Sequence, residues 1–306
     1  MSGRSSVSGA AGAPASGNPF AGDSRVRRRL ALNRTIEGLS TLAALIAVAV
    51  LLFVVLSVLA RGASAISLDF FVNGPAPFGQ SGGGIANALV GTAVLVAIAA
   101  AIALPVGILV GLYTAEFAPA AIASVVRFAL DILNGVPTIV TGIFVFGLLV
   151  AGHAQSGWAG SVALAIIMLP IVARSAHEVL ALVPTSLQEA ALALGIPRWK
   201  ATLRIIVPSA GGGLITGGLL AIARVTGETA PLLLTSSIAS TLISANPSQA
   251  LASVPVRIFE LSESPSPADH AQAWAAGLVL ILFVLLLSVL ARALYGRSQR
   301  RIGAAR

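Results

Sequence analysis

The feature that most limits how this chain can fold is a series of long apolar runs with almost no charge. Between Ile85 and Leu112, for example, no residue is charged. About 20 consecutive apolar residues suffice for a helix to cross the hydrocarbon core of a bilayer. Runs of about this length predict transmembrane helices at residues 36–60, 85–112, 128–150, 158–174, 205–235 and 273–291.

The composition agrees with a chain that lies largely in a membrane. Of its 306 residues, 57% are hydrophobic and 10% are charged, whereas an ordinary soluble protein has about 25% charged residues. We therefore expect an all-α, polytopic membrane protein with six transmembrane helices in a membrane domain at residues 25–306. Residues 1–24 are rich in Ser, Gly, Ala and Pro, a composition that predicts a disordered cytoplasmic tail.

The positive charges indicate how the chain is oriented. A net charge of +8 is also found in proteins that bind nucleic acid, but here the arginines flank the apolar runs, as charges that set membrane topology do. With six spans, every arginine and lysine except Arg61, Arg224 and Arg257 falls on the side of the two termini. Because such residues accumulate in cytoplasmic loops, we expect both termini in the cytoplasm and no nucleic-acid partner.

The first apolar run has a second interpretation, as a secretion signal that is removed. Arg27-Arg28 precedes it, and the cleavage-like triplet Ala63-Ser64-Ala65 follows it. The apolar part of a signal peptide is about 7–15 residues long. The run from Ile36 to Ala60 is longer and has no charge after Glu37, which favours a retained first span.

The sequence lacks the residues of several kinds of active site. There is no cysteine, and the single lysine, Lys200, is followed by alanine, whereas a phosphate-binding P-loop needs Ser or Thr there. The three histidines are too scattered to suggest a metal site. We therefore expect a chain with no catalytic residue, no metal and no cofactor of its own. Any ATP that drives it must be hydrolysed by another chain.

A short amphipathic helix is expected between the fourth and fifth spans, within residues 184–204. Ser186 and Glu189 have the spacing of a capping box, in which two side chains satisfy backbone N–H groups at the start of a helix. Gly195 suits the left-handed position after a helix, and Pro197 prevents its continuation. A helix of about two turns is unstable alone in water, so this helix must dock against a partner.

The same segment resembles the EAA loop of bacterial ABC-importer permeases. The matching residues are Glu189, Ala190, Ala191, Gly195 and Pro208. The family's usual leucine before the proline is valine here. The resemblance implies the permease fold of type I ABC importers, in which this segment is a coupling helix seated in a groove of a cytoplasmic ATPase. The alternative is an amphipathic segment at the membrane surface that has no partner.

Two charged residues, Arg224 and Glu228, lie inside the predicted fifth span. Their spacing places them on one face of a continuous helix. A charge at the centre of a membrane costs about 2.5–3.5 kcal/mol on insertion scales, which predicts that these residues pair, line a water-filled path, or do both. A packing ion pair and a lining of the translocation pathway therefore both remain open.

Three more charged residues lie near the predicted cytoplasmic surface. Arg174, at the end of the fourth span, is either a topogenic charge that reaches the membrane surface or a second residue of the pathway. Glu116 and Asp131 are expected to be cap or loop residues.

The surroundings of these charges resemble the PstA-type permeases of phosphate importers. The matching stretches are residues 223–232, residues 131–138, Met168-Leu169-Pro170 ahead of Arg174, and residues 82–85 with Asn87. The resemblance extends from about residue 30 to the C-terminus. It implies phosphate as the substrate, which the donor fork of arginine suits, and a place in the bacterial inner membrane.

The same resemblance implies the remaining parts of an importer. They are a PstC-like second permease, two copies of a cytoplasmic ATPase that bind ATP and Mg, and an extracytoplasmic phosphate-binding protein, all assembled in membrane lipid. Two other functions remain as alternatives: a permease for another oxyanion, such as molybdate or sulfate, and a secondary transporter that works alone. Secondary transporters often contain inverted repeats, and the sequence shows no convincing internal repeat.

Overall fold

The computed structural model describes residues 24–76, 82–236 and 240–303. The expected tail at residues 1–24 lies, except for Ser24, outside this described part. The chain divides into two compact units, residues 1–55 and 56–306, and each is described by itself. The regular elements of the described residues are helices, which confirms the all-α prediction.

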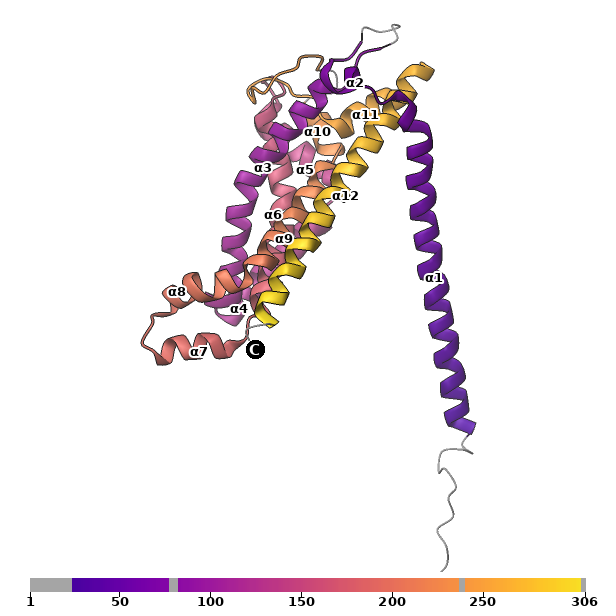
Figure 1. Cartoon of the computed structure of the whole chain (residues 1–306). Coiled ribbons are helices and arrows are strands. Elements are labelled where there is room, and N and C mark those ends of the chain that lie inside the picture. The colour runs from indigo at the N-terminus through magenta and orange to yellow at the C-terminus, as the bar shows by residue number, and fades with distance from the viewer. Residues whose placement is uncertain (1–23, 77–81, 237–239, 304–306) are drawn as a thin grey trace, which may run out of the picture. The chain divides into compact units, whose positions relative to one another are not determined.

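The described part of the first unit is the larger portion of helix α1 (Ser24–Gly62), which contains the first predicted span (Figure 1). Its apolar side chains are exposed from Leu30 to Val54; Phe53, for example, is 72% exposed. A helix that is apolar all round is stable only when lipid or other helices cover it. The exposure of α1 therefore fits a membrane span.

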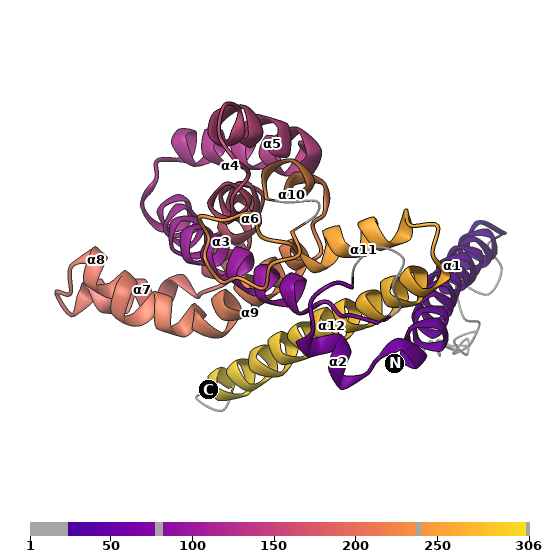
Figure 2. The ribbon, with the colours of Figure 1, turned by 90° about the horizontal axis from the view of Figure 1, so that it is seen from above.

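The second unit is built around helix α6 (Gly157–Ala181). Figure 2 shows α6 among α3 (Ala86–Leu112), α5 (Thr138–Val145) and α10 (Ala230–Thr235). Helix α9 (Val207–Thr226) packs against α6 and also against α12 (Pro267–Gly303). The buried centre of this unit is apolar and includes Leu95, Ala99, Leu164, Met168 and Val225.

Glycines allow α3 and α6 to approach closely. A Cβ atom added at Gly107 would lie 2.8 Å from the Cβ atom of Val172, and one added at Gly111 would lie 2.6 Å from the Cβ atom of Ala176. Small residues spaced by four bring helix backbones together in membranes. The GxxxG pair of α3 therefore lies at the contact with α6.

The third predicted span is not one straight helix. Helix α4 (Ala120–Gly135) and helix α5, which continues as a π-helical turn (Phe146–Val150), meet at an angle of 94°. The bend lies at Val136-Pro137, where Val136 is extended. Proline has no N–H to continue a helix, and it disfavours helical backbone in the residue before it, which explains why the single helix predicted at 128–150 is wrong.

The fifth predicted span is also interrupted. Short helix α8 (Arg198–Ala201), a π-helical turn (Thr202–Ile206) and α9 follow one another without a break, but α9 ends at Thr226. Helix α10 then begins at Ala230, with Pro231 in its first turn. The glycine at position 227 ends the first helix, and the proline starts the second, so the predicted continuous helix at 205–235 is wrong.

Five helical stretches of the described residues are long and apolar enough to cross a membrane, and the bent pair α4–α5 raises the number to six if it counts as one span. The five stretches are residues 28–65, 86–117, 157–181, 198–226 and 267–293.

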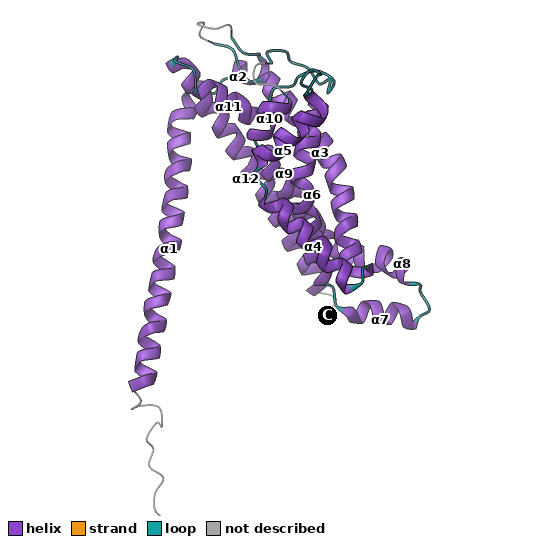
Figure 3. Cartoon of the chain, turned by 180° about the vertical axis from the view of Figure 1, so that it is seen from behind, coloured by secondary structure: helices purple, strands orange, loops and turns teal. Residues whose placement is uncertain are grey.

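Two connections gather at one end of the second unit, opposite the helices α7 (Thr185–Ala193) and α8 (Figure 3). The first contains a short 3₁₀ turn (Ala63–Ala65) and helix α2 (Leu68–Val72). The second, between α10 and α12, contains helix α11 (Val254–Ser262), whose Val254 and Val256 are buried. The Thr92 hydroxyl of α3 accepts a hydrogen bond from the Val254 N–H at 2.9 Å, which ties this connection to the bundle.

Candidate functional site

The predicted coupling helix is present as α7, but its first turn differs from the prediction. The helix begins at Thr185, directly after Pro184, and no side chain caps it. Ser186 and Glu189 therefore both lie inside the helix, and the predicted capping box is wrong. Pro184 has a φ of −59°, already close to the helical value, and the helix starts two residues earlier than the Ser-x-x-Glu pattern indicates.

The end of α7 matches the prediction for Gly195. This residue has a φ of +76°, in the left-handed region that glycine adopts without steric cost. The Gly195 N–H donates to the Leu192 carbonyl at 2.9 Å, and the Ile196 N–H donates to the Ala191 carbonyl at 3.0 Å. These are the two hydrogen bonds of a Schellman motif. Pro197 then precedes the next helix, α8.

One face of this segment leaves apolar side chains uncovered. Ala191 is buried against the body of the protein, whereas Glu189 and Ala190 are exposed. The exposed large apolar residues of the segment are Leu187, Leu192, Leu194 and Trp199. Several exposed large apolar side chains on one short surface segment are typical of a protein–protein contact. The last EAA-like residue, Pro208, lies in the first turn of α9.

The segment is attached to the body through the turn between α3 and α4, a π-helical turn at Tyr113–Phe117. The Gln188 Nε2 atom of α7 donates to Glu116 Oε2 at 3.0 Å. From α8, Arg198 donates through Nη2 to the Glu116 carbonyl oxygen, and its guanidinium lies 5.6 Å from the centre of the Phe117 ring. Helices α7 and α8, which together form the predicted coupling segment (185–201), therefore both hold the same turn.

Arg174 lies on α6 and is held by two carboxylates. Its Nη1 atom is 2.6 Å from Asp131 Oδ1, and its Nε atom is 3.1 Å from Glu178 Oε1. Asp131 belongs to the interior of α4, so its predicted position in a cap or loop is wrong. The sequence signals the pair with Glu178, four residues away on one helix. Nothing local signals the pair with Asp131, which is 43 positions away.

A second polar contact nearby joins α6 and α4 to the turn that follows α3. The Thr114 hydroxyl is 2.9 Å from the Val110 carbonyl, to which it donates, and 3.1 Å from His177 Nδ1. Because the hydroxyl proton is used, the hydroxyl accepts the Nδ1 proton of a neutral imidazole. His177 Nε2 is then the acceptor that faces Arg127 Nη1, at 3.5 Å. The sequence reasoning missed this cluster because its members come from separate segments.

Arg224 and Glu228 are not arranged as the sequence predicts. Arg224 is exposed on the last turn of α9, and Glu228 lies beyond the end of that helix and is half-buried. Both residues are in the described part of the chain, and no ion pair joins them. The break after Thr226 removes the common helix face on which the predicted pair depends, so the paired arrangement is wrong.

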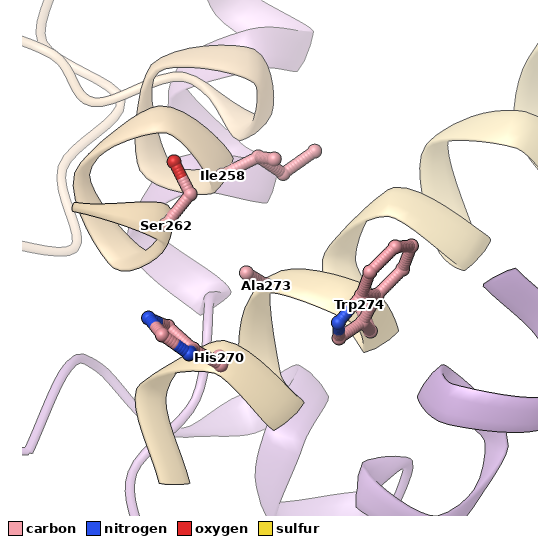
Figure 4. Close-up of a pocket in the computed structure, with 5 residues that line it drawn as sticks. All are labelled: Ile258, Ser262, His270, Ala273 and Trp274. Atoms are coloured by element: carbon pink, nitrogen blue, oxygen red, sulfur yellow. The ribbon is translucent and has the colours of Figure 1, made fainter. Parts of the chain in front are cut away.

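A separate depression of about 310 Å³ lies between α11 and the start of α12. Figure 4 shows its lining residues Ile258, Ser262, His270, Ala273 and Trp274. It is open and mostly apolar, and it contains none of the predicted site residues. Among the residues that the structure describes, no group of three His, Asp or Glu side chains is arranged to hold a metal ion.

The sequence was compared with known families and proteins. A profile of the family described as "Binding-protein-dependent transport system inner membrane component" matches residues 107–304. The chain is 41% identical to the phosphate transport system permease protein PstA of Yersinia pestis, over 81% of this chain and 85% of that protein. Its identity to the PstA of Xylella fastidiosa (strain Temecula1) is 42%, over 89% and 96% of the two chains.

The fold was compared with solved structures. An inward-facing MetNI methionine ABC transporter superposes with a TM-score of 0.54 at 19% identity, over 70% of this chain and 94% of the other. An amino acid ABC transporter crystallised with histidines gives a TM-score of 0.51 at 18% identity, over 70% and 92%. These likenesses establish the permease fold of ABC importers. The family profile and the PstA relatives together show that the chain belongs to the binding-protein-dependent transport system inner membrane components and, among them, to the PstA-type permeases.

Proposed function

We propose that this chain is the membrane-spanning subunit of an ATP-driven importer that moves inorganic phosphate into the cytoplasm. The observation that carries the proposal is the 41% identity to a phosphate transport permease over 81% of this chain. Two arginines, Arg174 and Arg224, supply suitable chemistry, because both are exposed on the single chain and a guanidinium binds phosphate oxygens through parallel hydrogen bonds. Both are proposed to line the translocation pathway.

The ATPase partner is proposed to bind the coupling segment. The apolar side chains of this segment, with Leu194 80% exposed, are left uncovered by the part of the chain that the structure describes, and Glu189 beside them offers a charge to a partner. Two copies of a cytoplasmic ATPase would bind ATP and Mg, while this chain holds neither and catalyses no hydrolysis. Closure of the ATPases would move the coupling segment and switch the spans between outward-open and inward-open states.

The rest of the assembly follows from the same proposal. A PstC-like permease would complete the pathway, and an extracytoplasmic phosphate-binding protein would deliver phosphate at the end opposite α7 and α8. The chain would lie in the bacterial inner membrane with both termini in the cytoplasm. The excess of arginine on that side of the sequence supports this orientation.

A charge reversal on the coupling segment tests the proposal. The importer is purified with wild-type chain or with Glu189→Lys, and co-purification of the ATPase and uptake of labelled phosphate into proteoliposomes are measured. The variant is expected to insert normally, lose most of the bound ATPase and lose uptake. The reason is that a positive charge would replace the Glu189 carboxylate where the ATPase is proposed to bind it. Glu263→Lys makes the same charge change at an exposed residue after α11, and it should retain the ATPase.

The outcomes separate architecture from substrate. Unchanged ATPase binding and uptake in Glu189→Lys would mean that α7 is an ordinary surface helix. Loss of the ATPase together with a wild-type importer that accumulates sulfate or molybdate would leave the architecture in place and refute phosphate as the substrate.

A further inference from the structure

The guanidinium of Arg174 is bound by carboxylates at two of its three nitrogen atoms, although it is exposed. A guanidinium can bind an oxyanion with two parallel hydrogen bonds along either of two edges, Nε with Nη2 or Nη1 with Nη2. Glu178 occupies Nε, and Asp131 occupies Nη1. Each edge therefore has one donor already bound to a carboxylate, and neither is free to bind phosphate in the two-donor mode.

The two carboxylates differ in whether they move together with Arg174. Glu178 is four residues from Arg174 on α6, so it moves with the arginine whenever that helix moves. Asp131 is on α4, and its contact lasts only while α4 and α6 keep their present positions. The edge formed by Nη1 and Nη2 is therefore the one that a helix movement can free.

The contact with Asp131 is also weak enough to exchange. The side chains of Arg174 and Asp131 are 57% and 55% exposed, and ion pairs so open to solvent contribute little to stability because water competes for both partners. A phosphate dianion carries more charge than a carboxylate, and it can occupy both donors of an edge at once. Once α4 moves, phosphate can therefore take the place of the aspartate.

The structure also provides a route by which α4 can be moved. The helix begins directly after the turn at Tyr113–Phe117, which Gln188 and Arg198 of the coupling segment hold. At its other end, α4 meets the 94° bend at Val136-Pro137, where the regular helical hydrogen bonds stop. In Figure 3, α4 lies towards the same end of the unit as α7 and α8. A displacement of the coupling segment would thus reach α4 through this turn, whereas α6, which residues 182–184 join to α7, is held by its packing at the centre of the unit.

From these contacts we propose that Asp131 is a displaceable counterion that masks Arg174, and that movement of α4 exposes the arginine to inorganic phosphate. This inference rests on the proposed phosphate transport and adds a specific residue to it. Asp131 returns to the arginine when α4 returns, which expels the bound phosphate and makes the site a transient one.

The test is direct binding of radiolabelled inorganic phosphate to the purified permease–ATPase complex without the binding protein and without ATP. Asp131→Asn is expected to bind phosphate about fivefold more tightly than wild type, because the change replaces a charged acceptor for Nη1 with a weaker neutral one and removes a nearby negative charge. The same variant should transport phosphate more slowly in proteoliposomes, because release is no longer assisted. Asp131→Glu keeps the carboxylate and should remain close to wild type.

A double variant shows whether the gain depends on the arginine. Asp131→Asn with Arg174→Ala should bind phosphate no better than Arg174→Ala alone. The proposal is overturned if Asp131→Asn leaves phosphate binding unchanged, or if the gain persists without Arg174. Uptake by the wild-type importer is measured in parallel and tests the proposed substrate separately, since it does not depend on the behaviour of the Asp131 variants.

Discussion

At the scale of single residues, the two arginines differ in their surroundings. Arg174 is bound by carboxylates from two helices, whereas Arg224 is exposed beside a break between two helices and forms no ion pair with Glu228, both lying in the described part of the chain. Backbone groups left open at such breaks commonly border the substrate path of a membrane transporter. Arg224 is therefore expected to contact the substrate directly without first losing a counterion, unlike Arg174.

Replacement of Arg224 tests this expectation. Arg224→Ala should lower the rate of phosphate uptake by about tenfold or more. This reduction corresponds to the loss of one or two charge-assisted hydrogen bonds to phosphate. Arg224→Lys should fall between the alanine variant and wild type, because lysine keeps the charge but lacks the planar fork. Uptake is measured in proteoliposomes that contain equal amounts of assembled importer. Full activity of the alanine variant would remove Arg224 from the pathway.

At the scale of elements, the link between the coupling segment and the turn at Tyr113–Phe117 is the contact with the clearest mechanical consequence. Arg198 holds this turn by a hydrogen bond to its backbone and by its position over the Phe117 ring. Arg198→Ala should therefore leave ATP hydrolysis largely intact and lower the amount of phosphate imported per ATP hydrolysed, because motion of the segment is passed on less completely.

The measurement is the ratio of the phosphate uptake rate to the ATPase rate in one preparation. Lys200→Ala is the matched control, since Lys200 lies over Trp199, within the coupling segment itself, and its loss should leave the ratio unchanged. If Arg198→Ala lowered both rates in proportion, the residue would serve assembly and not transmission.

The elements also show how far the sequence could predict the structure. Long apolar runs and a glycine in the left-handed position depend on local sequence, and so the helices and the end of α7 could be foreseen. The presence of Pro137 was visible, but the size of the bend depends on the packing of α5 against α10. Helix α11 was missed because it is short, lies among prolines and is stabilised by tertiary burial of residues such as Val256.

The candidate site was predictable only in part, for the same reason. Arg174 could be selected from its position near the end of an apolar run, and Glu178 from helical spacing. The partner Asp131 and the contact between Gln188 and Glu116 join residues 43 and 72 positions apart. Such pairs are decided by how helices pack, which no local pattern records.

At the scale of the whole molecule, the second unit keeps its two kinds of contact surface at opposite ends. The coupling segment is at one end, and the connections that contain α2 and α11 are at the other (Figure 3). This separation suits a protein that binds its substrate on one side of a membrane and is driven by an ATPase on the other side. Charged groups such as Arg174 and Asp131 belong to the helices between these ends.

The central claim is that the assembled chain imports phosphate at the expense of ATP. The most direct measurement is uptake of labelled phosphate by proteoliposomes that contain the importer, its binding protein and ATP on the ATPase side, with and without excess sulfate or molybdate. We expect accumulation that requires ATP and is unaffected by either competitor. Equal accumulation without ATP, or preferential accumulation of sulfate or molybdate, would contradict the claim.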